Sequence, residues 1–89
     1  MNLHNFLQDF LLELGESLGF DCKKESMVGN YSIDVVWRIN MCPVVAFEVE
    51  LFNSQNQINR NIFKLRLCGA EKKFMIYVND EKIKIEKII

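Results

Sequence analysis

Three acidic side chains on two predicted neighbouring strands are the residues best placed to do chemistry. Asp34 lies in the run 31–37, which is rich in β-branched and aromatic residues as strands are. Glu48 and Glu50 lie in a similar run, 44–51, and should share one face because side chains alternate along a strand. If Asp34 faces the same way, three carboxylates converge, repel one another and raise one another's pKa. Mg²⁺ removes that conflict, since it favours a few carboxylates, waters and phosphate oxygens. The spacing therefore predicts a metal site suited to phosphodiester chemistry.

The composition restricts the class of protein. A chain of 89 residues makes one small domain, and a hydrophobic content of 49% leaves apolar surface to hide, so self-association is expected. The net charge of −1 excludes a polycation that coats nucleic acid, so phosphate binding would need a local patch. The three cysteines are widely separated and lack a C-x-x-C pair, so we expect reduced thiols rather than disulfides or a zinc site.

The hydrophobic pattern predicts a single α/β domain over residues 1–89. Apolar residues recur at helical spacing in two segments, and short β-branched runs lie between and after them. The expected elements are a helix (2–18), three strands (20–28, 31–37 and 44–51), a second helix (54–70) and a buried strand (73–78). The tail, residues 82–89, fits either an edge strand or a short helix.

The predicted second helix has a polar and basic face. The side chains that recur there at i, i+3, i+4 and i+7 spacing are Gln57, Arg60, Asn61 and Lys64. Around them, residues 52–73 hold five cations and one acid, a net charge of +4 on a chain whose total is −1. Cations beside clustered acids suit a phosphate backbone held over a metal ion.

This order of elements resembles the core of the PD-(D/E)XK nuclease superfamily, which includes many restriction endonucleases. The motifs that carry the resemblance are Ile33-Asp34-Val35-Val36 and Phe47-Glu48-Val49-Glu50. It spans essentially the whole chain as a pattern of helix, three strands, helix and strand. The implied fold is a restriction-endonuclease-like α/β core with a central mixed sheet, in two or three layers.

The resemblance also implies roles for individual residues. Asp34 and Glu48 match the acids that ligate Mg²⁺ or Mn²⁺, and the backbone carbonyl of Val49 commonly completes the protein's share of the coordination. Glu50 stands where the family usually has lysine. A minority of restriction endonucleases carry glutamate there, where it serves as a base or an extra ligand, so Glu50 is assigned a catalytic role.

Further roles follow for the two helices. Lys64 or Arg60 could replace the missing lysine, and Gln57 with them would contact the nucleic acid. The implied reaction is hydrolysis of a nucleic-acid phosphodiester, with DNA favoured as the substrate. The first helix often contributes a glutamate to such sites, and the candidates here are Gln8, Asp9 and Glu13.

We expect a cytoplasmic homodimer that does not associate with membranes. The start of the sequence lacks the basic and apolar regions of a signal peptide, and no apolar run reaches transmembrane length. Paired sites suit a duplex substrate, and a dimer would bury Phe63, Leu67 or the C-terminal isoleucines.

The same pattern also fits less specific interpretations. The nuclease fold could be retained without catalysis, as a nucleic-acid-binding or assembly module, because Glu50 replaces the usual lysine. The chain could also be a purely structural dimeric domain. Asp34 could form an ion pair with Lys23 or Lys24, and Glu48 and Glu50 could face solvent on a half-exposed strand.

Two further side chains are expected to be structural. His4 lies in the first turn of the predicted helix, where a surface or capping role is favoured over catalysis. Trp37 should share a core-facing side of its strand with Tyr31 and Ile33, opposite Asp34.

Overall fold

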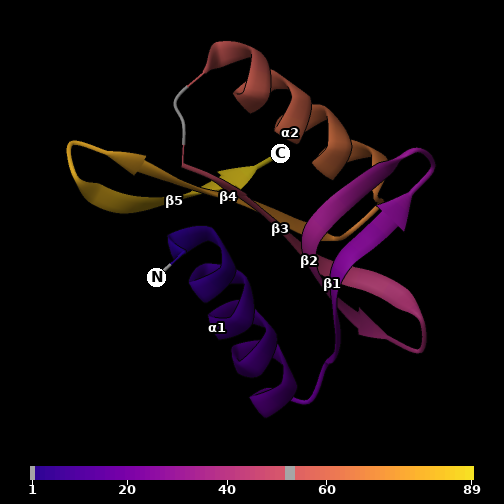
Figure 1. Cartoon of the computed structure of the whole chain (residues 1–89). Coiled ribbons are helices and arrows are strands. Elements are labelled where there is room, and N and C mark those ends of the chain that lie inside the picture. The colour runs from indigo at the N-terminus through magenta and orange to yellow at the C-terminus, as the bar shows by residue number, and fades with distance from the viewer. Residues whose placement is uncertain (1, 52–53) are drawn as a thin grey trace.

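The computed structural model describes residues 2–51 and 54–89, which form two helices and five strands (Figure 1). The order is α1 (Leu3–Ser17), β1 (Asp21–Val28), β2 (Tyr31–Ile39), β3 (Cys42–Glu50), α2 (Gln55–Leu67), β4 (Lys72–Asn79) and β5 (Lys82–Ile88). The predicted sequence of helix, three strands, helix and strand is confirmed, with boundaries shifted by at most a few residues. The tail, for which two structures were possible, is the edge strand β5.

The strands form one mixed sheet in the order β1-β2-β3-β4-β5. Neighbouring strands are antiparallel except β3 and β4, which are parallel because α2 carries the chain back across the sheet. In Figure 1 the two helices lie on opposite faces of the sheet. The fold is therefore α/β with a central mixed sheet, and of the two expected layer arrangements it has the three-layered one.

Each helix covers its own apolar cluster. The cluster beneath α1 is formed by Leu7, Leu11, Val35, Trp37, Val45, Phe47, Val49 and Ile76. The cluster beneath α2 is formed by Ile33, Val36, Ala46, Leu65, Ala70, Met75 and Ile88.

Gly15 lets α1 approach the sheet closely, because a Cβ at that position would overlap Cys22 and Trp37. The indole Nε1 of Trp37 donates to the carbonyl oxygen of Leu11 at 3.0 Å, which joins α1 to β2. Trp37 is therefore a core residue, as predicted.

Both ends of helix α1 carry residues that are common at helix ends. The side chain of Asn2 accepts a hydrogen bond from the backbone N–H of Asn5 at 3.1 Å and caps α1. Gly19, with a φ of 94°, follows the end of that helix.

Neither helix, within the described residues, combines the length and apolar character needed to cross a bilayer.

At Asp34 the alternation of side chains along β2 is interrupted, which corrects one prediction. Tyr31, Ile33 and Trp37 were expected on one side of β2, yet Ile33 packs beneath α2 and Trp37 beneath α1. The backbone pairing of β2 with β1 skips Asp34, and its pairing with β3 ends at Val35. Instead, the Asp34 backbone N–H donates to a side chain, Glu48 Oε1, at 3.1 Å. Strict alternation fails there because side chains replace the regular ladder.

Candidate active site

A pair of buried acids lies at the centre of the sheet, on the adjacent strands β2 and β3. Asp34 is 8% exposed and Glu48 is 2% exposed. Hydrogen bonds join the two strands at this pair. Glu48 Oε1 accepts from the Asp34 N–H, and Asp34 Oδ2 accepts from the Val49 N–H at 2.8 Å. Ionised groups are rarely so deeply buried without partners, so these two carboxyl groups call for a compensating interaction.

Helix α2 supplies partners on one side of the pair. Lys64 Nζ lies 3.2 Å from Glu48 Oε2, and its side chain is only 14% exposed. The amide of Asn61, which is itself buried, donates to Glu50 Oε2 at 3.1 Å. Glu48 and Glu50 therefore share the α2 face of β3, as the alternation of the strand predicted.

Helix α1 supplies partners on the other side. His4 Nε2 lies 3.4 Å from Asp34 Oδ2. The amide of the buried Gln8 donates to the backbone carbonyl oxygen of Asp34 at 3.3 Å and to Glu25 Oε1 at 2.8 Å. Glu25 has a φ of 51°, an uncommon backbone conformation for a residue within a strand. Asp34 is thus held by the Val49 N–H of β3 and by α1, and Glu48 by the Asp34 N–H and by α2.

The structure therefore pairs two carboxylates rather than gathering three. Asp34 and Glu48 interact directly, whereas Glu50 is bound to Asn61 at the end of β3. Within residues 2–51 and 54–89, no three His, Cys, Asp or Glu side chains form a group suited to hold a metal ion. The expected convergence of all three acids on one point is not observed in these residues, and the side chain of Glu50 contacts Asn61 instead.

Burial and like charge together shift the titration of the pair. Burial, with the neighbouring charge of Asp34, raises the pKa of Glu48 to about 8, and Lys64 only partly offsets the rise. Burial also raises the pKa of Asp34, against the hydrogen bond from the Val49 N–H and the charge of His4, which lower it. Both carboxyl groups cannot easily be ionised together, which is the electrostatic conflict that a bound cation would relieve.

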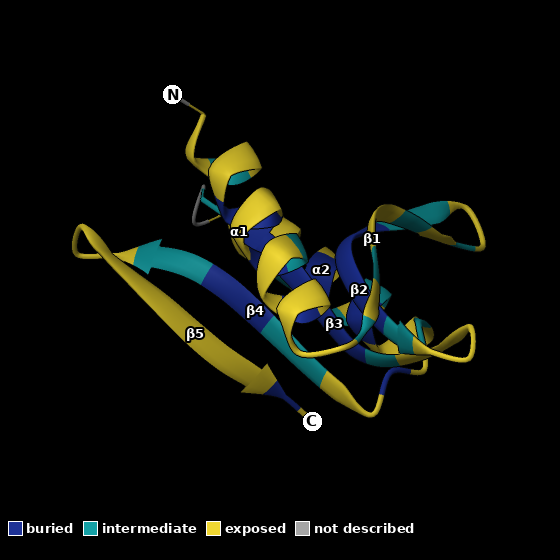
Figure 2. Cartoon of the chain, turned by 90° about the horizontal axis from the view of Figure 1, so that it is seen from below, coloured by how far each residue is buried: buried dark blue, intermediate teal, exposed yellow. Residues whose placement is uncertain are grey.

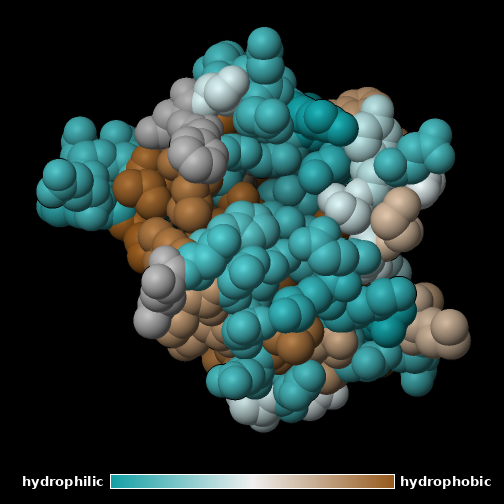
Figure 3. All heavy atoms as spheres, in the orientation of Figure 1, coloured by the Kyte–Doolittle hydropathy of each residue, from teal (hydrophilic) through white to brown (hydrophobic). Residues whose placement is uncertain are grey.

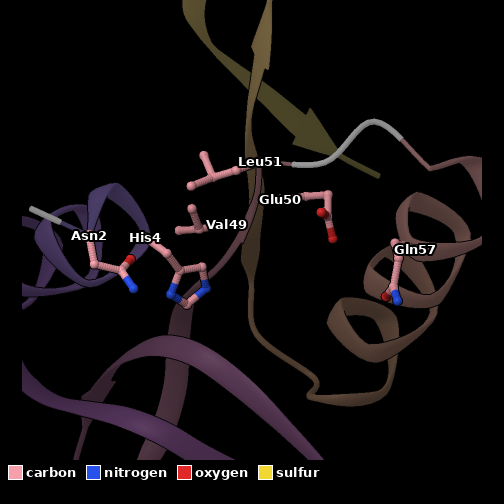
Figure 4. A pocket seen from close by; sticks show the side chains of 6 residues that line it. All are labelled: Asn2, His4, Val49, Glu50, Leu51 and Gln57. Atoms are coloured by element: carbon pink, nitrogen blue, oxygen red, sulfur yellow. The ribbon is translucent and has the colours of Figure 1, made fainter.

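An open cleft of about 480 Å³ lies at the end of β3, between the first turns of the two helices (Figure 4). Its lining residues are Asn2, His4, Val49, Glu50, Leu51 and Gln57. In Figure 4, Glu50 and Gln57 lie on the α2 side of the strand, and Asn2 and His4 lie on the α1 side. Because His4 and Val49 both contact Asp34, the cleft leads to the buried pair.

The α2 residues predicted to contact nucleic acid lie in different places. Gln57 lines the cleft, and Lys64 lies at the buried pair. Arg60 lies apart from the carboxylates, with its guanidinium carbon 5.8 Å from the centre of the Tyr31 ring. The Phe63 ring meets Tyr31 edge-on, with ring centres 5.9 Å apart. The basic face of α2 thus has one cation at the buried pair and another on an aromatic cluster.

The less specific interpretations fail for two residues, Glu48 and Lys24. Glu48 is buried and does not face solvent. Lys24 does not pair with Asp34, because its Nζ forms an ion pair with Asp9 Oδ1 at 2.6 Å. That exposed pair also removes Asp9 from the site. Glu13 is exposed on α1, so Gln8 is the first-helix candidate that reaches Asp34.

Sequence reasoning missed His4 as a site residue. His4, Gln8 and Leu11 recur at i, i+4 and i+7, so they share the face of α1 that packs on the sheet. That spacing would have placed His4 beside the carboxylates once α1 was assigned to β2. Glu25 gave no comparable signal, because its place opposite Asp34 depends on the register of β1.

Comparison with known proteins gave no match, whether with protein-family models, curated proteins or solved structures.

Proposed function

We propose that this chain is a metal-dependent nuclease with a restriction-endonuclease-like core. The observation that carries the proposal is the buried Asp34–Glu48 pair, which has Lys64 at 3.2 Å on one side and an open cleft beside it. A purely structural site gains little from two buried acids of like charge, because their burial destabilises the fold. A site that binds a hard cation at the phosphate of a substrate needs such a pair.

The residues present fit Mg²⁺ or Mn²⁺. Asp34, Glu48 and the backbone carbonyl of Val49 would hold the ion, and waters and phosphate oxygens would supply the other ligands. The fit rests on the donor chemistry and on the raised pKa of Glu48, which reflects charge that lacks full compensation. A bound divalent ion would supply stabilisation of negative charge on the phosphate and acidification of water.

The side chains around the pair then have definite tasks. Lys64 would steady the phosphate in place of the usual motif lysine, because its ammonium group already lies beside Glu48. Glu50, oriented by the amide of Asn61, would position the attacking water or accept its proton. His4 and Gln8 would hold the Asp34 carboxylate in place from α1.

The surroundings of the cleft suit a nucleic acid. The first turns of both helices border it, and helix N-termini attract phosphate groups. Helix α2 carries Arg60, Lys64 and Arg66 and no acid, so a phosphate backbone can lie along it. Arg60 over the ring of Tyr31, beside the exposed Phe63, offers a contact for a sugar or an unpaired base. DNA is the favoured substrate.

Asp34→Ala tests the proposal directly. Wild-type protein is incubated with Mg²⁺ or Mn²⁺ and a panel of duplex, single-stranded and branched DNA. Wild type should cleave at least one substrate, and Asp34→Ala should lose that activity by about a thousandfold or more, since it removes a ligand whose contribution is several kcal/mol. Asp9→Ala is the matched control, because Asp9 is an exposed acid outside the site and should leave cleavage unchanged. Equal cleavage by Asp34→Ala and wild type would exclude the assignment.

A catalytically inactive nuclease fold that binds nucleic acid is the second candidate. The observation that favours it is Glu50, which occupies the usual lysine position and is bound by Asn61. Such a protein would shift labelled DNA in a binding assay that needs no metal, and would cleave none of the panel. DNA binding abolished by removal of Mg²⁺ would instead favour the nuclease.

A further inference from the structure

The α1 face of the sheet is only half covered. Helix α1 packs on β1, β2 and β3, and Figure 2 shows β4 and β5 lying beside it without a helix over them. Ile85 on β5 is 67% exposed and Ile83 is 51% exposed. Their alternation places both on one face of β5, and Ile85 faces the α1 side, since it lines a hollow there together with residues of α1.

That hollow is an apolar trough between α1 and the β4–β5 hairpin. Its volume is about 450 Å³, and aromatic side chains dominate its walls. Phe10 and Leu14 from α1 form one wall, and Phe74 and Ile85 from the hairpin form the other. Figure 3 shows hydrophobic surface beside the tip of the β4–β5 hairpin, whose own surface is hydrophilic. An open apolar surface of this kind marks a site of association.

Helix α1 also carries an exposed apolar ridge beside the trough. Phe6 and Phe10, one turn apart, are 50% and 53% exposed, although they lie on a helix that already buries another face. With Leu3, Leu14, Ile83 and Ile85, they offer on the order of 600 Å² of exposed apolar surface, taking about 150–250 Å² for a whole aromatic side chain. A standard protein interface buries about 800 Å² per partner. Two such surfaces together give about 1,200 Å² of apolar area, which is the lower bound of the range that specific interfaces bury.

The charges beside the ridge and the trough are complementary. Helix α1 has three acids and no lysine or arginine, a net charge of −3. Of the five lysines on β4 and β5, Lys72 and Lys87 share the trough face with Phe74 and Ile85, because side chains alternate along a strand and Lys87 pairs with Phe74. Asp9 and Glu13 follow Phe6 by three and seven residues and therefore border the ridge. Lys72 lines the trough. A ridge bordered by acids fits a trough bordered by lysines.

We propose that a second copy of this chain covers the trough. The α1 ridge of each copy lies over β4 and β5 of the other, about a two-fold axis, so that the same surface contacts itself. The dimer buries Phe6, Phe10 and Ile85, and leaves α2 exposed on the opposite face of the sheet. The interface therefore differs from the one expected from Phe63 and Leu67, both on α2, and shares with it only the C-terminal isoleucines.

Sedimentation or light scattering of the full chain tests the arrangement without measuring cleavage, so its result is separate from that of the nuclease proposal. Wild type should have twice the monomer mass of 10.5 kDa at micromolar concentration. Ile85→Lys and Phe6→Lys should each raise the dimer dissociation constant at least tenfold, with unchanged circular dichroism, because both side chains are half exposed or more in the monomer. Phe63→Lys is the matched control, since Phe63 is 51% exposed on α2, and it should leave the dimer intact.

Charge reversal tests the orientation of the two copies. Glu13→Lys should raise the dissociation constant several-fold at low salt and less at high salt, whereas Glu71→Lys, an exposed acid outside α1, should not. A wild-type chain that stays monomeric at high concentration would overturn the proposal. So would a dimer that dissociates with Phe63→Lys and survives Ile85→Lys, or one that Glu13→Lys leaves unchanged.

Discussion

The buried part of β3 combines two kinds of chemistry: an apolar half, residues 45–47, and a polar half at Glu48. From Val45 to Phe47 the strand contributes apolar side chains to the clusters beneath both helices. At Glu48 it places a carboxyl group that is 2% exposed next to a second buried acid. Burial stabilises the first half through the hydrophobic effect and opposes ionisation in the second. A chain that keeps both in one strand accepts a local loss of stability where its chemistry would take place.

The largest expected effect lies in the apolar half. Phe47→Ala should lower the free energy of unfolding by about 3–5 kcal/mol, because it removes a buried ring and leaves a cavity. The Phe47 ring contacts Trp37 and Phe74, with ring centres 4.8 Å and 5.6 Å away. Urea unfolding followed by circular dichroism measures the change. The exposed Phe63 serves as the control, and its alanine variant should lose much less. Equal losses would mean that β3 does not anchor the core.

The next largest effect concerns Lys64, the cation beside Glu48, and the rate of cleavage. Lys64→Met should lower the rate of metal-dependent cleavage by about a hundredfold, as loss of one preorganised charge at a reacting phosphate commonly does. Arg66→Met removes an exposed cation from the same helix and should have little effect on the rate. Steady-state cleavage rates of the two variants provide the comparison. Similar rates in both would assign Lys64 to structure alone.

A smaller effect concerns stability and pH in the absence of metal. The folded pKa of Glu48, about 8, lies above its ordinary value of 4.5, so between these values the folded state binds more protons than the unfolded state. The free energy of unfolding should therefore fall as pH rises from about 4.5 to about 8. Glu48→Gln cannot ionise and should exceed wild type in stability at pH 8, by on the order of 1 kcal/mol or more.

Melting temperatures between pH 5 and pH 8 measure this difference. The gap between Glu48→Gln and wild type should shrink toward pH 5, where Glu48 is protonated in the folded state. Glu13→Gln, an exposed acid on α1, should track wild type across the range. If wild type and Glu48→Gln keep a constant gap, the Glu48 carboxyl group does not titrate as described.

The sequence predicted the elements of this fold well, for physical reasons that differ from one element to the next. Helices α1 and α2 carry apolar residues at helical spacing, and β3 has a β-branched run bounded by turn residues. Residues 82–89 were undecided because alternating lysine and isoleucine fit both a strand and a helix. In the structure, antiparallel hydrogen bonding with β4 fixes residues 82–88 as a strand.

The candidate site was less predictable, because its geometry depends on one irregular residue. The predicted site assumed that Asp34 faces the same way as Glu48 and Glu50, which share a face by alternation. In the structure the side chains of Asp34 and Glu48 replace the backbone ladder, and β2 changes face at that point. The roles of His4 and Gln8 depend on how α1 crosses the sheet, which no local pattern specifies.

Calorimetric titration of the wild-type chain with Mn²⁺ tests the central claim most directly. The central claim predicts one ion bound per chain, with protons released on binding because Glu48, with a pKa of about 8, is mostly protonated at neutral pH. Binding should be lost in Asp34→Ala and Glu48→Gln. Absence of binding to wild type, or equal binding by wild type and Glu48→Gln, would contradict it.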